Sequence, residues 1–117
     1  ERCRTAVISN KADYAVKILC DVFFPGKFDA VYGERESMGI KKKPDPQAVL
    51  AVLDEFKTDR KDAVYIGDSE VDIATAKNAG VDGIIVSWGF REKEILIQNG
   101  AECIVDTSQE LVDKILG

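Results

Sequence analysis

The sequence predicts an α/β fold: a parallel sheet of about four to five strands with helices on both faces. Short apolar runs, rich in Val and Ile, alternate along the chain with segments whose apolar residues recur at helical spacing. Gly, Pro, Asn and Asp separate these segments. Strands that alternate with helices favour parallel pairing through right-handed crossovers. The length of 117 residues fits one domain, expected over 1–117.

The first half of the chain is expected to hold two strands and two helices. Their ranges are 5–8 (strand), 11–23 (helix), 29–33 (strand) and 47–57 (helix). A polar loop with Gly39 and two prolines precedes the second helix. Pro46 suits the first turn of that helix, because its missing N–H would have no partner there, and Asp45 is the expected N-cap.

The second half continues the alternation. Its expected ranges are 63–67 (strand), 69–80 (helix), 83–89 (strand), 91–98 (helix), 102–106 (edge strand) and 108–116 (helix). Gly80 is a good residue to end the first of these helices, since glycine accepts the left-handed conformation there. Ser108 is the expected N-cap of the last helix.

Composition excludes several classes of function. With a net charge of -5 and acidic residues spread along the chain, binding to nucleic acid through phosphate contacts is not expected. No apolar run approaches the length of a membrane helix. The chain contains no histidine, which excludes Ser-His hydrolases and most zinc chemistry. The three cysteines are far apart in sequence, which favours reduced thiols in a cytoplasmic protein.

Three polar signals follow the ends of successive strands, where ligands bind in open parallel sheets. Ser9 and Asn10 could offer a hydroxyl, an amide and backbone N–H groups to an anion. Lys43 could present an ammonium to a phosphate. Asp68 directly follows a buried strand and Asp72 lies one helical turn further on, and carboxylates with waters and a phosphate are the usual ligands of Mg²⁺.

Each signal also has a purely structural alternative. Asp68 or Ser69 could simply cap the helix, with Asp72 as a first-turn acid that favours the helix dipole. Polar residues such as Ser9 often cap helices at strand-to-helix turns, and a run of lysines is often a solvated loop. Spacing alone does not separate these alternatives.

In combination and order, the three signals resemble the haloacid dehalogenase-like hydrolase superfamily, in its phosphoglycolate phosphatase-like branch. "AVISN", with Ser9, is similar to the second motif of the family, and "KKPDP", with Lys43, to the third. "IGDSEVDIATAKNAG", with Asp68 and Asp72, is similar to the fourth. The pattern "GDSxxDxxxAxxAG", followed by a strand that ends in "WG", is fairly specific to that branch.

The resemblance implies the role of each site residue. Ser9, Asn10 and Lys43 would bind the substrate phosphate, and Asp68 would be a ligand of Mg²⁺, the implied cofactor. Ser69 and Asp72 would not bind the metal directly but would hold the residues that do. Asp72 would orient the waters bound to the metal, or Lys43. In the family, an aspartate attacks phosphorus to form an aspartyl-phosphate.

The match is incomplete at the first motif of the family. That motif, D-x-D-G-[TS], supplies the nucleophile and does not occur in this sequence. The resemblance therefore implies an incomplete Rossmann-like core without the central nucleophile strand and without the cap domain. It implies the C-terminal core portion of a Mg²⁺-dependent phosphatase for a small phosphorylated metabolite, and a chain that is inactive alone.

Other readings stay open. One is a non-catalytic α/β module that binds phosphate or metal, or a subunit completed in trans. A flavodoxin-like receiver fits less well, because the acids and the lysine occur in the wrong order. Without the central strand, two strand edges would be exposed. We expect either direct pairing of the strands "TAVIS" and "AVYIG", or coverage of the edges by another copy or by an N-terminal segment.

Overall fold

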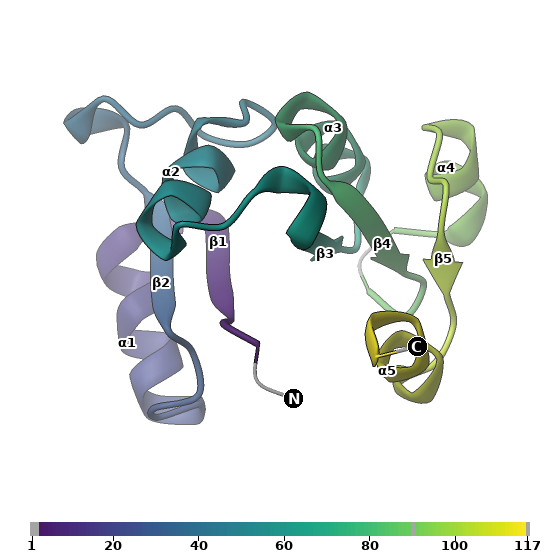
Figure 1. Cartoon of the computed structure of the whole chain (residues 1–117), viewed down its shortest axis with the longest axis horizontal. Coiled ribbons are helices and arrows are strands. Elements are labelled where there is room, and N and C mark those ends of the chain that lie inside the picture. Colours follow the sequence, from purple (N-terminus) through teal and green to yellow (C-terminus); the bar gives the residue numbers. More distant parts are fainter. Residues whose placement is uncertain (1–2, 90, 117) are drawn as a thin grey trace. The chain divides into compact units, whose positions relative to one another are not determined.

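The computed structural model describes residues 3–89 and 91–116 (Figure 1). By their internal contacts, the residues divide into two compact units, Glu1–Thr58 and Asp59–Gly117. Each unit contains its own parallel sheet, and each is described separately below.

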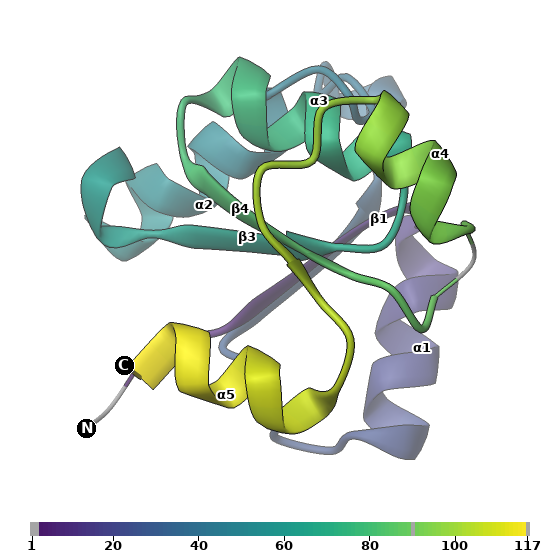
Figure 2. The same cartoon turned by 90° about the vertical axis from the view of Figure 1, so that its right-hand side faces the viewer.

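The first unit is built from two strands, two α-helices and a short 3-10 helix. They are β1 (Ala6–Ala12), α1 (Asp13–Phe23), β2 (Ala30–Glu34), η1 (Glu36–Met38) and α2 (Gln47–Phe56). β1 and β2 pair in parallel, with Ala6 opposite Ala30, and α1 and α2 lie on opposite faces of this sheet (Figures 1 and 2). The buried apolar side chains of the unit are Val16, Ala30, Ala48, Val49 and Val52.

In its described residues, the second unit contains three strands, three α-helices and another 3-10 helix. They are η2 (Arg60–Asp62), β3 (Val64–Gly67), α3 (Glu70–Ala79), β4 (Asp82–Val86), α4 (Lys93–Gln98), β5 (Ile104–Val105) and α5 (Ser108–Leu116). The strand order is β3-β4-β5, and all pairs are parallel.

The central strand β4 explains why helices cover both faces of the second sheet. Successive side chains of a strand point to opposite faces. Ile85 points to one face, where it packs with Ile73 of α3 and Leu96 of α4. Ile84 and Val86 belong to the opposite cluster, with Val105 and with Leu111 of α5. Figure 2 shows α3 and α4 on one side of this sheet and α5 on the other.

The predicted α/β class with parallel strands and helices on both faces is confirmed, with β1 to β5 as its strands in the described residues. Within the units, β1 pairs with β2 and β3 pairs with β4. Direct pairing of "TAVIS" with "AVYIG", one of the two expected ways to cover the exposed edges, would join the two units and stays a prediction. Within the described residues, no helix has the length and apolar character that crossing a membrane requires.

Element boundaries differ from the prediction at functionally relevant places in the first unit. β1 continues to Ala12, so Ser9 and Asn10 lie within the strand rather than in a turn after it. Pro46 occupies the N-cap position of α2 instead of its first turn. Asp45 is therefore not the N-cap that the sequence predicted but the residue before it. Its carboxylate still accepts a hydrogen bond from the N–H of Gln47, the first residue of the helix, at 2.9 Å.

In the second unit the ends of two helices test the capping predictions. Gly80 ends α3 in the left-handed conformation, with φ of 73°, as predicted. Ser108 is not the N-cap of α5 but its first residue. The hydroxyl of Thr107 accepts a hydrogen bond from the N–H of Glu110 at 3.1 Å, so Thr107 provides the cap. Ser is the slightly better N-cap by composition, so the backbone path, and not residue preference, selects Thr107 here.

Candidate functional site

Ser9 and Lys43 both lie in the first unit. Both line one small pocket at the end of the sheet, although Ser9 lies on β1 and Lys43 in the loop before α2. The Oγ of Ser9 accepts a hydrogen bond from the N–H of Lys11 at 3.1 Å. Among the described residues, no acceptor is found for the Ser9 hydroxyl hydrogen, so the hydroxyl can donate to a ligand. The two residues thus line one pocket, and their binding of a phosphate stays a prediction.

Asn10 joins these two segments. Its Oδ1 accepts a hydrogen bond from the N–H of Lys43 at 3.0 Å. Its Nδ2 donates to the carbonyl oxygen of Lys43 at 3.1 Å. The two partners are 33 residues apart in the sequence. Both polar atoms of the side-chain amide are therefore engaged with one residue of the loop.

The pocket around Ser9 is rich in positive charge. Arg35, Lys41, Lys42 and Lys43 line it, and Glu34 is the acidic residue of the lining. The Nζ of Lys42 lies 3.9 Å from the Oε1 of Glu36, and both side chains are about half exposed. Such a partly exposed ion pair neutralises little of the positive charge at the pocket, because water screens the interaction between the two side chains. The pocket therefore favours an anionic ligand.

Asp13 fixes the start of α1 against β2 beside this pocket. Its Oδ1 accepts a hydrogen bond from the N–H of Gly33 at 2.9 Å, and its Oδ2 lies 2.8 Å from the Nζ of Lys17. The hydrogen bond from Lys17, followed by that from Gly33, lowers the pKa of the Asp13 carboxyl. A side chain on Gly33 would overlap the backbone at Lys11 and Asp13, so only glycine allows this approach.

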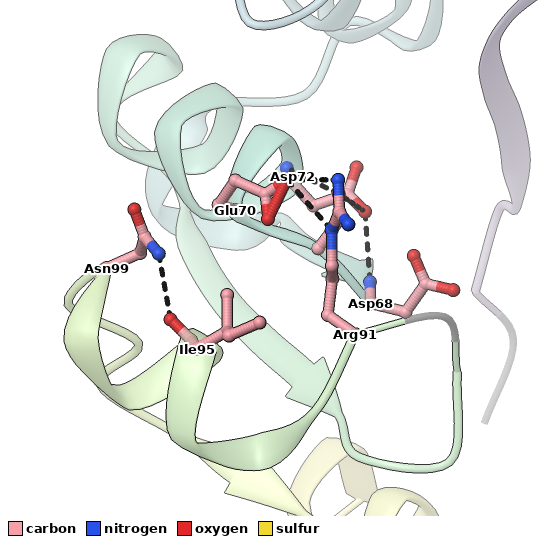
Figure 3. A network of polar contacts seen from close by, with 7 residues as sticks. Asp68, Glu70, Asp72, Arg91, Ile95 and Asn99 are labelled. Carbon is pink, nitrogen blue, oxygen red and sulfur yellow. Dashed lines mark hydrogen bonds and ion pairs between the residues drawn. The ribbon is translucent and has the colours of Figure 1, made fainter.

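In the second unit, Asp68 follows β3 and Asp72 lies in the first turn of α3. Asp72 is buried, with 6% of its surface exposed. Its Oδ2 accepts hydrogen bonds from the N–H of Asp68 at 2.9 Å and from the hydroxyl of Ser69 at 3.3 Å. In Figure 3 the bond to Asp72 comes from the backbone N–H of Asp68, and the Asp68 carboxylate lies to the right of that bond. Asp72 thus holds the backbone of Asp68.

Tyr65 completes this network, and sequence reasoning did not identify it. Its hydroxyl donates to the Oδ1 of Asp72 at 2.8 Å. Burial, reinforced by the negative charge of Asp72, raises the pKa of Tyr65 strongly. The side chain therefore stays a neutral hydrogen-bond donor. An aromatic residue in an apolar strand is typical of a hydrophobic core. The sequence alone therefore does not distinguish a tyrosine whose hydroxyl supports a site from one that only fills the core.

Two glycines leave room for the two aspartates. A Cβ atom on Gly67 would overlap the side chain of Asp72, and one on Gly89 would overlap the side chain of Asp68. Gly89 belongs to the "WG" pair after β4. The loop after β4 is joined to α3 by an ion pair, with the Nη2 of Arg91 2.8 Å from the Oε1 of Glu70 (Figure 3).

The donor set of the second unit fits Mg²⁺ in part. Asp68 supplies a carboxylate that packs so closely on Gly89 that a Cβ atom there would overlap it. No group of three or more Asp, Glu, His or Cys side chains in the described ranges, 3–89 and 91–116, could hold a metal ion. Mg²⁺ is usually held by one or two carboxylates together with waters and phosphate oxygens, so Asp68 suffices as one of its ligands.

Comparison with known proteins agrees with these features. Residues 1–86 match the family model described as haloacid dehalogenase-like hydrolase. The chain is 31% identical to a candidate pyrophosphatase, PpaX, of Caldanaerobacter subterraneus, over 100% of this chain and 53% of that protein. It is 33% identical to phosphoglycolate phosphatase of Aquifex aeolicus, over 74% of this chain and 40% of that protein.

A crystal structure of a candidate phosphoglycolate phosphatase from Lactobacillus delbrueckii subsp. bulgaricus has the same fold. It superposes with a TM-score of 0.92 and 45% identity, covering 97% of this chain and 47% of that chain. The chain therefore spans about half the length of these relatives.

Proposed function

This chain belongs to the haloacid dehalogenase-like hydrolase family, and on that premise we propose that it is the C-terminal core portion of a Mg²⁺-dependent phosphatase for a small phosphorylated metabolite. The sequence contains no D-x-D-G-[TS] motif. The nucleophile that forms the aspartyl-phosphate must then come from residues other than these 117. That both units belong to one core domain is part of the proposal.

The pocket shared by Ser9 and Lys43 is the observation that carries this proposal. The Ser9 hydroxyl donates to a phosphate oxygen, and the Lys43 ammonium balances its charge. Phosphoryl transfer depends mainly on positioning and on neutralising charge, so these residues suit it without a histidine.

Asp68 is the residue of this chain that would bind Mg²⁺. When bound, the metal neutralises phosphate charge. Asp72, with Ser69 and Tyr65, keeps the Asp68 backbone in place through the hydrogen bonds described above. The carboxylate of Asp72 is buried and accepts these bonds, which suits a supporting role rather than direct contact with substrate.

The substrate class follows from the relatives and from the charge of the pocket. The relatives carry the names phosphoglycolate phosphatase and pyrophosphatase, and both names denote small phosphorylated molecules with a second anionic group. The pocket beside Ser9 is lined mainly by cationic side chains. A small phosphorylated metabolite of high negative charge, such as phosphoglycolate, fits both observations.

A hybrid protein tests this proposal. Residues 1–117 would be joined to the part of the L. delbrueckii relative that they do not match, and phosphate release from phosphoglycolate and from pyrophosphate would be measured with Mg²⁺. We expect turnover by the hybrid and none by the 117-residue chain alone. Ser9→Ala, Lys43→Ala and Asp68→Asn should each lower kcat/KM by about 100-fold or more, as loss of a transition-state contact does.

Two results would contradict the proposal. One is full turnover by the hybrid carrying Lys43→Ala. The other is a folded hybrid that binds phosphate and Mg²⁺ without hydrolysing any phosphoester, which would favour the alternative of a non-catalytic binding module. The unmodified L. delbrueckii protein is the positive control.

A further inference from the structure

We propose that Asn10 is a positioning residue, which fixes Lys43 beside Ser9 and thereby determines the affinity of the pocket for phosphate. This inference rests on the proposed function and deepens it. The sequence suggested that Asn10 binds substrate directly. The geometry points to a different role, since both polar atoms of its side chain bond to the backbone of Lys43.

The two hydrogen bonds hold the peptide groups on either side of the Lys43 Cα. The N–H of Lys43 belongs to the preceding peptide and its carbonyl to the following one. Fixing both planes fixes the direction in which the Cα–Cβ bond leaves the backbone. The lysine stem has four further rotatable bonds, so a defined starting direction narrows the positions that the ammonium can reach.

The element that carries Asn10 makes it a suitable anchor. Asn10 lies on β1, which pairs with β2, whereas Lys43 lies in a loop between η1 and α2. Ser9 is the neighbour of Asn10 on the same strand. One rigid strand therefore places the Ser9 hydroxyl directly and the Lys43 ammonium through Asn10, so that both groups line the same pocket.

Hydrogen exchange of the Lys43 amide tests the contact itself. Asn10→Ala should expose this N–H to solvent and speed its exchange by at least about tenfold, because an accepted hydrogen bond is lost. Asn99→Ala is the matched control. Asn99 donates from Nδ2 to the carbonyl oxygen of Ile95 at 2.8 Å at the end of α4, so its variant also removes an exposed amide-to-backbone bond (Figure 3).

Phosphate affinity tests the consequence. Inorganic phosphate would be titrated into the 117-residue chain and followed by NMR shifts of residues 8–11 and 41–44. We expect Asn10→Ala to weaken binding by about tenfold, the cost of a mispositioned charged partner, and Asn99→Ala to leave binding unchanged. The exposed Asn10 contributes little to folding, so the melting temperature should change by only a few degrees.

A double-mutant cycle separates positioning from direct contact. If Asn10 acts through Lys43, then Asn10→Ala should cost no further affinity once Lys43→Ala is present. Additive losses would overturn the positioning role and restore direct contact between Asn10 and phosphate. Equal phosphate affinity of wild type and Asn10→Ala would also overturn it.

Failure of the proposed function would look different from failure of this inference. A wild-type chain that binds no phosphate at any accessible concentration contradicts the phosphate pocket itself. In that event, unchanged exchange of the Lys43 amide in Asn10→Ala would overturn the contact as well, whereas faster exchange would support it.

Discussion

The buried carboxylate of Asp72 accepts a hydrogen bond from the hydroxyl of Tyr65 on β3. Removing that hydroxyl in Tyr65→Phe leaves the ring in place but deletes one hydrogen bond to a buried charge. We expect the free energy of unfolding to fall by about 1–2 kcal/mol, measured by urea denaturation. An unchanged free energy of unfolding would show that the Tyr65 hydroxyl contributes nothing net.

The same tyrosine makes stability depend on alkaline pH. Its pKa is raised in the folded state above the ordinary value of 10.0. Above pH 10, the unfolded chain releases this proton while the folded chain keeps it, so the free energy of unfolding falls as pH rises. Tyr65→Phe should therefore show a shallower decline than wild type between about pH 10 and 11. Tyr32, whose pKa is also raised, mainly by its hydrogen bond to Glu55, contributes to the slope that remains in the variant.

Gly67 allows the tight approach of β3 to Asp72. A methyl group there would overlap the Asp72 side chain. Gly67→Ala should destabilise the second unit by about 1–3 kcal/mol, as overpacking does, and should shift the NMR resonance of the Asp68 amide that bonds to Asp72. If the overlap is the cause, the same substitution should cost less in an Asp72→Ala background. If Gly67→Ala lowers the free energy of unfolding equally in wild type and in Asp72→Ala, overlap with Asp72 is not the cause.

At the scale of elements, α5 offers a direct comparison of two neighbouring hydroxyl residues. Thr107 accepts the hydrogen bond that caps the helix, whereas Ser108 is the first residue of the helix itself. Thr107→Ala should therefore lower the free energy of unfolding by about 1 kcal/mol. Ser108→Ala should change it by less than about 0.5 kcal/mol. The reverse ranking, measured by thermal unfolding, would restore Ser108 as the cap.

The elements could be predicted from sequence because their apolar periodicity is strong and local. Their ends could not be predicted as well. β1 extends beyond its predicted end and includes Ser9 and Asn10, because its pairing with β2 continues, after a register shift, to Ala12. Pairing of this kind depends on a partner strand that lies far away in the sequence, and it overrides the local signal of a polar dipeptide.

The site shows the same division between local and non-local information. Asp68 and Asp72 are one helical turn apart, so their proximity could be inferred from spacing. The hydrogen bonds between Asn10 and Lys43 join residues 33 positions apart, and no repeating pattern in the sequence predicts such a contact. Tyr65 was missed for another reason, because its hydroxyl matters only through the burial of Asp72, which the fold creates.

At the scale of the whole molecule, the terminal strand β3 of the second sheet is the feature with consequences beyond one site. β3 is the terminal strand in the order β3-β4-β5. Its side chains Val64 and Ile66 are 40% and 42% exposed. An edge strand with unpaired backbone groups and exposed β-branched residues is a template for pairing with another chain. Coverage of this edge by a second copy is therefore the expected behaviour of the isolated chain.

Sedimentation velocity over a range of concentrations would measure this association. We expect the 117-residue chain to form dimers or larger species as concentration rises, and Val64→Thr with Ile66→Thr to reduce them while keeping good strand residues. Ile97→Thr is the matched control, since Ile97 is 57% exposed on α4, away from any strand edge. A chain that stays monomeric at every concentration would contradict the expectation, because the exposed edge would then be tolerated without a partner.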